Sequence, residues 1–513
     1  GQGLRAIGTF TIPGSRVVTL NQPNNVIEVS GGNTLTMGGA FQIPNVANNL
    51  FKRDRGTLVL TQSQPAWDGI LTIGQGVVRV SNAGVFGSAT GNTQVGNVSA
   101  ALELTNNITV SEPLIFTPGN NNTSNGIDAG GALRSVSGAN TWSGTIGFSG
   151  ASSADGQPRA ALIGVDSGST LTVSGVITGS IATGGSGRGN WIGLTGSGTG
   201  TISTAMTYTG DLSFGTFSLA KFGSGTWNLT AANLFPGQTV YAGQGVLSIN
   251  GSGSLGVPGA NGGTGTVFVT PGGTLRLDNS VSNLNDRLSG RAINLYGGAM
   301  DLVGSGVGPT SETSGALTLN PGQSIVTVSA GVGQRADLIV GPVTRAGGGT
   351  VLFRGSNLGL AAGADVATIS ASGAGLVAIG QNGAVGTANK GILPYALVSN
   401  SVGGTGSSFA TVDSVNGIIR SLSAAEVSNT LTNNLAGVAT PMNILLASGT
   451  STLSGSITGG SMVINSLTLG SSGGGISMQS SQMLVLDSGG LLAFSGNGGI
   501  SGGRLSTSSN REM

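Results

Sequence analysis

The side chains that could carry acid–base or metal chemistry are few in this chain. Its 513 residues contain no histidine and no cysteine, alongside 19 acidic and 20 basic residues. Without histidine, the commonest general base and the commonest zinc or copper ligand are missing. Without cysteine there is no thiol nucleophile. Polysaccharide cleavage by carboxylates with Lys or Arg is the enzymatic chemistry left open.

The acidic residues do not gather into a recognisable catalytic pattern. Asp278 and Asp286 flank a predicted turn, Asp301 follows the start of a predicted strand, and Asp54 and Asp68 lie within a repeat. No Asp-x-Asp pair lies on one strand face, and no acid recurs at a constant interval. We therefore expect no catalytic residue, no cofactor and no metal ligand, with the acids in turns or on solvated faces. Residues distant in sequence could still converge on one surface.

Two glycine-rich stretches superficially resemble ligand loops. The calcium-binding nonapeptide requires Gly-Gly-x-Gly-x-Asp, but Arg188 and Gly189 follow the glycines at 184–187. The glycines at 473–475 lack the Lys-Ser/Thr ending and the following helix of a phosphate loop. Both stretches are interpreted as turns.

The four tryptophans offer a further possibility, a platform on which sugar rings stack. Trp67, Trp142 and Trp227 lie within a repeated motif, whereas Trp191 does not. Because the motif recurs with the strands, core or corner packing is the favoured interpretation for the tryptophans.

Composition indicates an all-β chain with a long, narrow core. Glycine makes up 96 residues, which disfavours helices, and charged residues are only 8%. Mean hydropathy is +0.24 and net charge is +1, so the chain does not have the low hydropathy and high charge of disorder. This balance also gives no footprint for nucleic acid. The small basic cluster Lys52, Arg53 and Arg55 is interpreted as a solvated strand entry.

A short pattern of Thr or Ser followed by apolar, polar and apolar residues recurs along the chain. Its period of two places the apolar residues on one face of short strands that end at Gly, Asn or Ser. Evenly spaced turns favour a solenoid over separate sandwich domains. We predict a right-handed parallel β-helix with roughly 20–25 residues per coil and on the order of twenty coils, with asparagines stacked at its corners. The pattern occurs at 34–37, 57–60, 101–104, 170–173, 274–277, 316–319 and 466–469.

A longer repeat becomes explicit in two segments, 56–80 and 225–249. In each, two glycines that precede strands have the same spacing, Gly56 and Gly76 in one copy and Gly225 and Gly245 in the other. The segment 137–146 keeps the middle of this motif.

These segments resemble the autotransporter-associated β-strand repeat. Residues 223–229 match its opening, 137–144 its Asn-Thr-aromatic centre, and 240–247 its close, whereas the copy at 56–80 lacks the centre. The clear motif covers about a sixth of the chain. The resemblance implies a right-handed β-helical passenger exported across an outer membrane and displayed at the cell surface.

The solenoid is expected to be regular over 1–290, less regular over 291–440, and continued over 441–513. Residues 392–395 read as a loop, and the capping-box spacing of Ser423 and Glu426 predicts a short helix near 423–434. No apolar run approaches the ~20 residues of a membrane helix. Because residue 1 is Gly and no leader pattern follows it, we expect that any signal peptide has been removed.

The sequence thus predicts a secreted, non-catalytic structural protein of the bacterial cell surface or extracellular matrix. It would act as a filament subunit or an adhesin-like passenger. The expected partners are copies of itself, joined head-to-tail or laterally, or cell-surface and matrix components. No nucleic acid and no membrane-spanning segment are expected. The alternative is a carbohydrate-binding or polysaccharide-cleaving β-helix.

Overall fold

Parallel strands stacked in successive coils form most of the structure. The computed structural model describes residues 3–65, 67–88, 90–96, 98–117, 126, 130–148, 159–180, 190–209, 217–233, 239–256, 265–372, 376–413, 415–431, 441–452 and 461–508. The chain divides into two compact units, Gly1–Ile293 (unit 1) and Asn294–Met513 (unit 2), with β30 (Ile293–Leu295) at the division. Its parallel sheets confirm the predicted β-solenoid.

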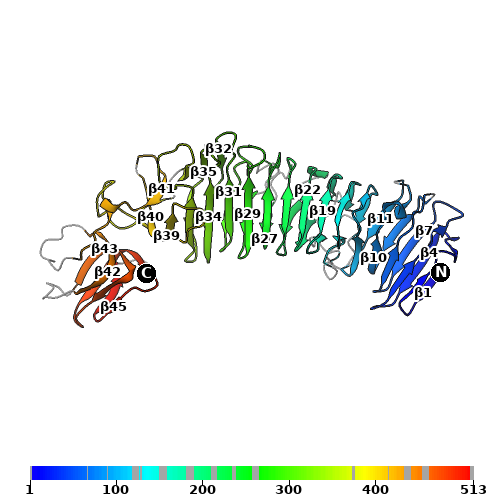
Figure 1. The fold of residues 1–513 in the computed structure, drawn as a ribbon, viewed down its shortest axis with the longest axis horizontal. Helices are drawn as coiled ribbons and strands as arrows, with labels where there is room; N and C mark the ends of the chain where they lie inside the picture. Colours follow the sequence, from blue (N-terminus) through cyan, green and yellow to red (C-terminus); the bar gives the residue numbers. More distant parts are fainter. Residues whose placement is uncertain are drawn as a thin grey trace, which may run out of the picture. The chain divides into compact units, whose positions relative to one another are not determined.

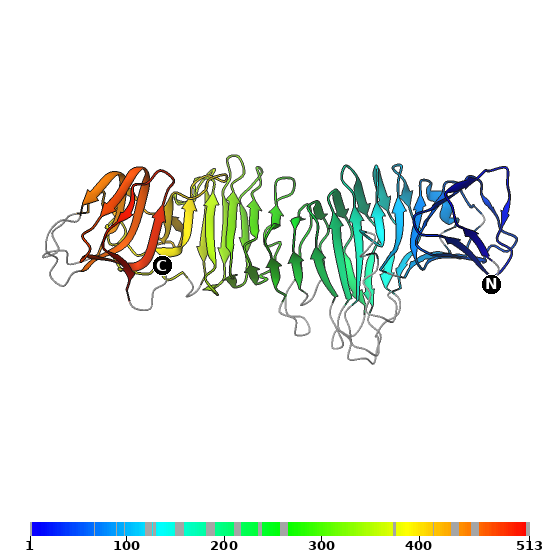
Figure 2. The ribbon, with the colours of Figure 1, turned by 90° about the horizontal axis from the view of Figure 1, so that it is seen from below.

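Unit 1 contains three long sheets, whose strands lie side by side in Figure 1 from blue to green. Figure 2 shows the same rows after a quarter turn. The first sheet has the order β1 (Gly3–Ala6), β4 (Asn24–Val29), β7 (Asn49–Arg53), β9 (Ile70–Ile73), β11 (Asn92–Val95), β14 (Leu114–Phe116), β17 (Ile146–Phe148), β20 (Ile177–Ser180), β23 (Met206–Thr209).

The second sheet of unit 1 runs through β2 (Phe10–Ile12), β5 (Thr34–Met37), β8 (Thr57–Leu60), β10 (Gly76–Val80), β12 (Ala100–Leu104), β15 (Leu133–Ser135), β18 (Arg159–Val165), β21 (Asn190–Gly196), β24 (Phe217–Lys221), β26 (Val240–Ala242) and β28 (Val267–Val269). The third runs through β13 (Thr109–Val110), β16 (Ala139–Trp142), β19 (Thr170–Val173), β22 (Thr199–Ile202), β25 (Thr226–Leu229), β27 (Gly245–Ile249) and β29 (Gly273–Asp278). The short strands β3 (Val18–Thr19) and β6 (Phe41–Gln42) pair with each other, and a 3-10 helix spans Ala83–Phe86.

Coil length varies along unit 1. Thr57 pairs with Val77 of the next coil and Leu219 with Val240, whereas Leu102 pairs with Leu133, so the longest coils lie in the middle of the unit. The predicted coil length therefore describes the first coils and the coil at the second repeat copy. The coils from β13 onward contain a strand of the third sheet.

The core is made of apolar side chains that point inward from the strands of each coil and stack in rows along the solenoid. Five residues in mutual register on the second sheet are wholly buried: Leu35, Leu58, Val78, Leu102 and Leu133. Full burial of such a side chain contributes roughly 1.5–3 kcal/mol. The predicted alternation is confirmed along strands β5 and β8, in which partly buried and buried residues alternate.

Asparagines stack between coils, although Asn24, Asn49 and Asn228 lie within strands and not at the predicted corners. The Nδ2 of Asn49 donates to Oδ1 of Asn24 at 3.1 Å, and the Nδ2 of Asn250 donates to Oδ1 of Asn228 at 2.9 Å. Asn107 lies at a turn with a φ of 58°. Asparagine tolerates this left-handed conformation better than most residues.

Unit 2 also contains parallel sheets. One begins with β31 (Ala299–Val303), β34 (Gln323–Ser329), β37 (Thr350–Gly355) and β39 (Leu393–Ser399), and ends with β40 (Ser408–Val412) and β41 (Ile419–Ser421). The others pair β33 (Leu317–Leu319) with β36 (Val343–Arg345), join β32 (Thr310–Thr313), β35 (Ala336–Val340) and β38 (Ala367–Ala371), and join β42 (Asn443–Thr452), β43 (Ser461–Ser477), β44 (Met483–Ala493), β45 (Gly499–Ser501) and β46 (Arg504–Thr507).

Unit 2 departs from the sequence-based expectations in four places. The glycines at 473–475, interpreted from the sequence as a turn, lie within strand β43. Strands β39, β40 and β41 pair antiparallel. The predicted loop at 392–395 contains the start of β39. The predicted helix near 423–434 is a single 3-10 turn, Ala424–Glu426, because Val427 is extended and ends it; residues 432–434 lie outside the described residues.

Candidate binding groove and buried ionic groups

The tryptophans inside the repeated motif are buried in the core, whereas the one outside it is not. Trp67, Trp142 and Trp227 are at most 1% exposed and pack in the core. Trp191 instead lies half-buried on the outer face, with its ring 5.3 Å from that of Tyr241. Tyr241 in turn stacks on Phe268 at 4.8 Å and 12°. Because the stacked rings cover one another's faces, this row is better suited to holding coils in register than to binding sugar rings.

The acids considered from the sequence are spread over turns and strand faces. Asp278 accepts hydrogen bonds from the backbone N and Oγ of Ser280, and Asp54 has a φ of 63° at a corner. Within the described residues, no three acidic side chains lie close enough together to hold a metal ion. The glycine-rich stretch at 184–189 lies outside the residues that the structure describes.

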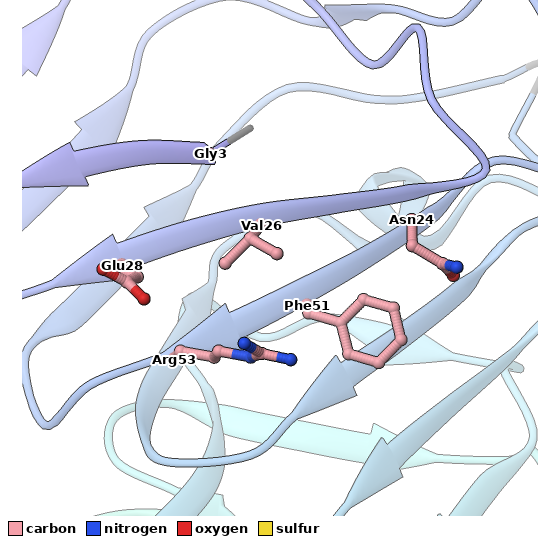
Figure 3. Close-up of a pocket in the computed structure, with 6 residues that line it drawn as sticks. All are labelled: Gly3, Asn24, Val26, Glu28, Phe51 and Arg53. Carbon is pink, nitrogen blue, oxygen red and sulfur yellow. The ribbon is translucent and has the colours of Figure 1, made fainter. Parts of the chain in front are cut away.

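A hollow of about 440 Å³ lies on the outer face of β1, β4 and β7 (Figure 3). Its floor follows one row of paired residues, Gly3, Val26 and Phe51. Gly3 packs closely on this floor, since a Cβ at its position would lie 2.9 Å from Val26 O, and Phe51 contributes an aromatic ring to the lining. The lining residues are Gly3, Asn24, Val26, Glu28, Phe51 and Arg53.

A second hollow of about 530 Å³ adjoins the first and shares Glu28 and Arg53 with it. Arg5, Asp54, Gly74 and Gln75 complete its lining. We call the two hollows together the N-terminal groove. Arg5 Nε lies 3.8 Å from Glu28 Oε2, and the Arg53 guanidinium lies 5.9 Å from the centroid of the Phe51 ring. The groove therefore combines cations, carboxylates and an aromatic ring, and sequence reasoning missed it.

The interpretation of Lys52 as a solvated residue is wrong, because its side chain is wholly buried. Its ammonium donates to the backbone oxygens of Arg53 at 2.9 Å, Asp54 at 2.6 Å and Gln75 at 3.1 Å. The Lys52 side chain thereby joins a corner of one coil to the next coil.

Lys221 repeats this arrangement. Wholly buried, it donates to the backbone oxygens of Phe222 at 2.6 Å, Gly223 at 2.6 Å and Gln244 at 3.0 Å. The spacing from Lys52 to Gly56 equals that from Lys221 to Gly225. The two copies occupy different sheets, since Lys52 belongs to β7 of the first and Lys221 ends β24 of the second. The repeat therefore specifies a local corner, and the shared Lys-to-Gly spacing is the signal that could have identified it.

Burial lowers the pKa of both lysines to about 8, and at Lys52 the charge of Asp54 opposes this shift. Desolvation disfavours the ammonium, while the three carbonyl oxygens around it supply compensating hydrogen bonds. This arrangement serves structural support rather than proton transfer, because both side chains are enclosed by the coils.

A ladder of charges on the second sheet is satisfied internally. Glu103 is nearly buried between Arg79, at 2.7 Å, and Arg134, at 3.3 Å, and Arg134 also pairs with Asp166 at 2.8 Å. These side chains connect neighbouring coils, so we assign the ladder to coil stacking and not to ligand binding.

Glu112 lies in the turn between β13 and β14, and only 4% of it is exposed. Burial raises its pKa to about 8. A raised folded-state pKa means that the folded chain binds this proton more tightly than the unfolded chain. The stability contributed by neutral Glu112 is therefore complete below its ordinary pKa of 4.5 and is lost as pH rises toward 8.

We predict that Glu112→Gln removes this pH dependence. The wild-type chain should lose on the order of a few kcal/mol of stability between pH 5 and 9, since one pKa unit corresponds to about 1.4 kcal/mol. Denaturant unfolding at a series of pH values measures this loss, with the exposed-face variant Glu28→Gln as the control. Parallel pH profiles for wild type and Glu112→Gln would contradict the assignment.

None of the helical segments that the structure describes has the length and apolar character needed to cross a bilayer. No protein-family model, no curated protein and no solved structure matches the chain.

Proposed function

We propose that this chain is a non-catalytic structural protein of the bacterial cell surface or extracellular matrix. Its β-solenoid would act as a rigid filament subunit or an adhesin-like passenger. The observation that carries the proposal is the unbroken inward row from Leu35 to Leu133, in which each coil continues the register of the one before. In such arrays, stability is approximately a sum of coil and interface terms, so length adds rigidity.

The resemblance of 223–229, 137–144 and 240–247 to the autotransporter-associated repeat supports export and surface display. Lys52 and Lys221 support the same reading, because each joins two coils at a repeat corner. An exposed scaffold benefits from such internal ties, since they keep the backbone closed against proteolysis.

The strand pattern favours copies of the same chain as partners. The two ends of a stack of parallel coils present strand edges, and the backbone groups of such an edge can pair with a further strand. A parallel edge extends with a strand in the same direction, which favours head-to-tail contact between copies.

Two observations test the structural role. Antibody against unit 1 should label intact source cells, and electron microscopy of concentrated full-length protein should show filaments or end-to-end pairs. Cytoplasmic retention in intact cells would refute surface display. Particles that stay single at every concentration would refute the filament form and leave the passenger form.

The alternative, a carbohydrate function, has one specific observation in its favour, the N-terminal groove. A cleaving enzyme would generate new reducing or unsaturated ends from polysaccharides. A binding protein would retain the polysaccharide unchanged, which is the outcome we expect.

A further inference from the structure

We propose that the N-terminal groove binds a carboxylate-bearing polysaccharide. This inference goes beyond the structural role and is independent of it, because a scaffold can be rigid whether or not its groove holds a ligand. It also assigns the groove a definite chemical class of ligand.

The geometry suits a chain-like ligand. Arg5, Glu28 and Arg53 form one row of paired residues on the outer face, so successive strands each present one charged side chain. Neighbouring strands are separated by about 4.8 Å. The two hollows adjoin at Glu28 and Arg53, which gives a path across several strands instead of a closed cavity.

Two arginines of the groove are open to an anionic ligand. Arg5 and Arg53 are both exposed and line the hollows, whereas Lys52 is wholly buried and already donates to three backbone oxygens. The lining also holds two acids, Glu28 and Asp54. Recognition of an anion therefore depends on direct contacts with the two arginines and not on a net positive charge.

Arg53 is the strongest candidate for binding the ligand carboxylate. Its guanidinium lies over the Phe51 ring, which limits its motion while leaving N–H groups to donate. A planar guanidinium binds a carboxylate with two parallel hydrogen bonds. Arg5 has a side chain that is 64% exposed and only loosely paired with Glu28, so it can contact a second anionic unit.

The acids of the groove distinguish a sugar from an acidic peptide. Glu28 and Asp54 accept hydrogen bonds, and a polysaccharide supplies many hydroxyl donors. Asn24, held by the side chain of Asn49, offers a further polar contact. A polyglutamate chain has few donors to offset repulsion from these two carboxylates, so it should bind more weakly.

Titration calorimetry of the full chain with oligogalacturonate tests the proposal. Binding should be detectable at low ionic strength, weaken as salt rises, and exceed binding of neutral dextran and of polyglutamate. Arg53→Gln should weaken binding about tenfold, because a charge-assisted hydrogen bond is lost. Phe51→Ala should also weaken binding, since the ring no longer holds the guanidinium.

Arg16→Gln is the matched control. Arg16 is exposed in the turn between β2 and β3 and lies outside the lining of the groove, so this variant removes the same charge with little effect on affinity. Circular dichroism should be unchanged for all three variants, because the substituted side chains point outward. The proposal is overturned if oligogalacturonate does not bind, if polyglutamate or dextran binds as tightly, or if Arg16→Gln weakens binding as much as Arg53→Gln.

Discussion

Replacing Glu426 with alanine should loosen unit 2 around β41, lowering local stability by about 3–5 kcal/mol, the range for breaking a buried ion pair. Glu426 is wholly buried. It accepts hydrogen bonds from Arg420 at 2.6 and 2.7 Å and from the backbone N of Gly386 at 3.0 Å. The variant leaves the Arg420 guanidinium with no carboxylate at this position, although Asp413 lies 3.9 Å from its Nε.

The lowered pKa of Glu426 makes the stability that this ion pair contributes depend on pH. Burial acts to raise this pKa, but hydrogen bonds from Arg420, Gly386 and Ser423, with the charge of Arg420, overcome burial and lower it to about 2. A lowered folded-state pKa stabilises the fold at pH values above the ordinary pKa of a glutamate. This contribution is lost as pH falls toward 2.

Hydrogen exchange in the full-length chain measures the effect of Glu426→Ala. The amides of Gly386 and Ser423, which donate to Glu426, should exchange much faster in the variant. Asp413→Asn is the control, because its longer pair with Arg420 should contribute less than Glu426. Unchanged protection at Gly386 and Ser423 would show that the pair does not hold this segment.

The second large effect is expected at the buried lysines. Lys221→Met keeps an apolar stem but leaves the oxygens of Phe222, Gly223 and Gln244 without their donor. A buried polar group without a partner costs about 1–3 kcal/mol, so the loss should reach about 3 kcal/mol or more. Lys52→Met should have a similar effect at the equivalent corner of the first repeat copy.

Hydrogen exchange of the amides of Gly225 and Val246, beside the Lys221 corner, provides the measurement. Each is hydrogen-bonded across coils, Gly225 N to Gly196 O and Val246 N to Gly225 O. Arg55→Met, at an exposed position in the first copy, is the control for removing a cation. If Lys52→Met and Lys221→Met are no more destabilising than Arg55→Met, the lysines do not tie the coils together.

The local sequence pattern predicted the fold, but it did not predict every side chain that the fold buries. Alternation identified the inward leucines because a strand presents successive residues to opposite faces. The same alternation places Lys52 on the face of Leu50, yet its charge favoured an exposed interpretation. Burial was not evident because the compensating groups are backbone oxygens of two coils; the shared Lys-to-Gly spacing marks the corner but does not show these oxygens.

The N-terminal groove could not be predicted for a different reason. It depends on which residues of neighbouring coils pair, and the coils differ in length. Gly3 pairs with Val26 and Val26 with Phe51, so even these first two coils take unequal stretches of chain. A slip of one residue would turn every side chain to the opposite face. Similarly, the antiparallel pairing of β39, β40 and β41 follows from tertiary contacts that the strand pattern does not encode.

Distances between paired spin labels in unit 1 test coil stacking most directly. Thr36, Val59 and Thr195 lie in one outward row, with Val59 one strand and Thr195 six strands from Thr36. The cysteine-free chain allows labels at chosen pairs. At about 4.8 Å per strand, backbone separations should be about 5 Å for Thr36–Val59 and about 29 Å for Thr36–Thr195. Separations that do not grow with the number of intervening strands would contradict the solenoid.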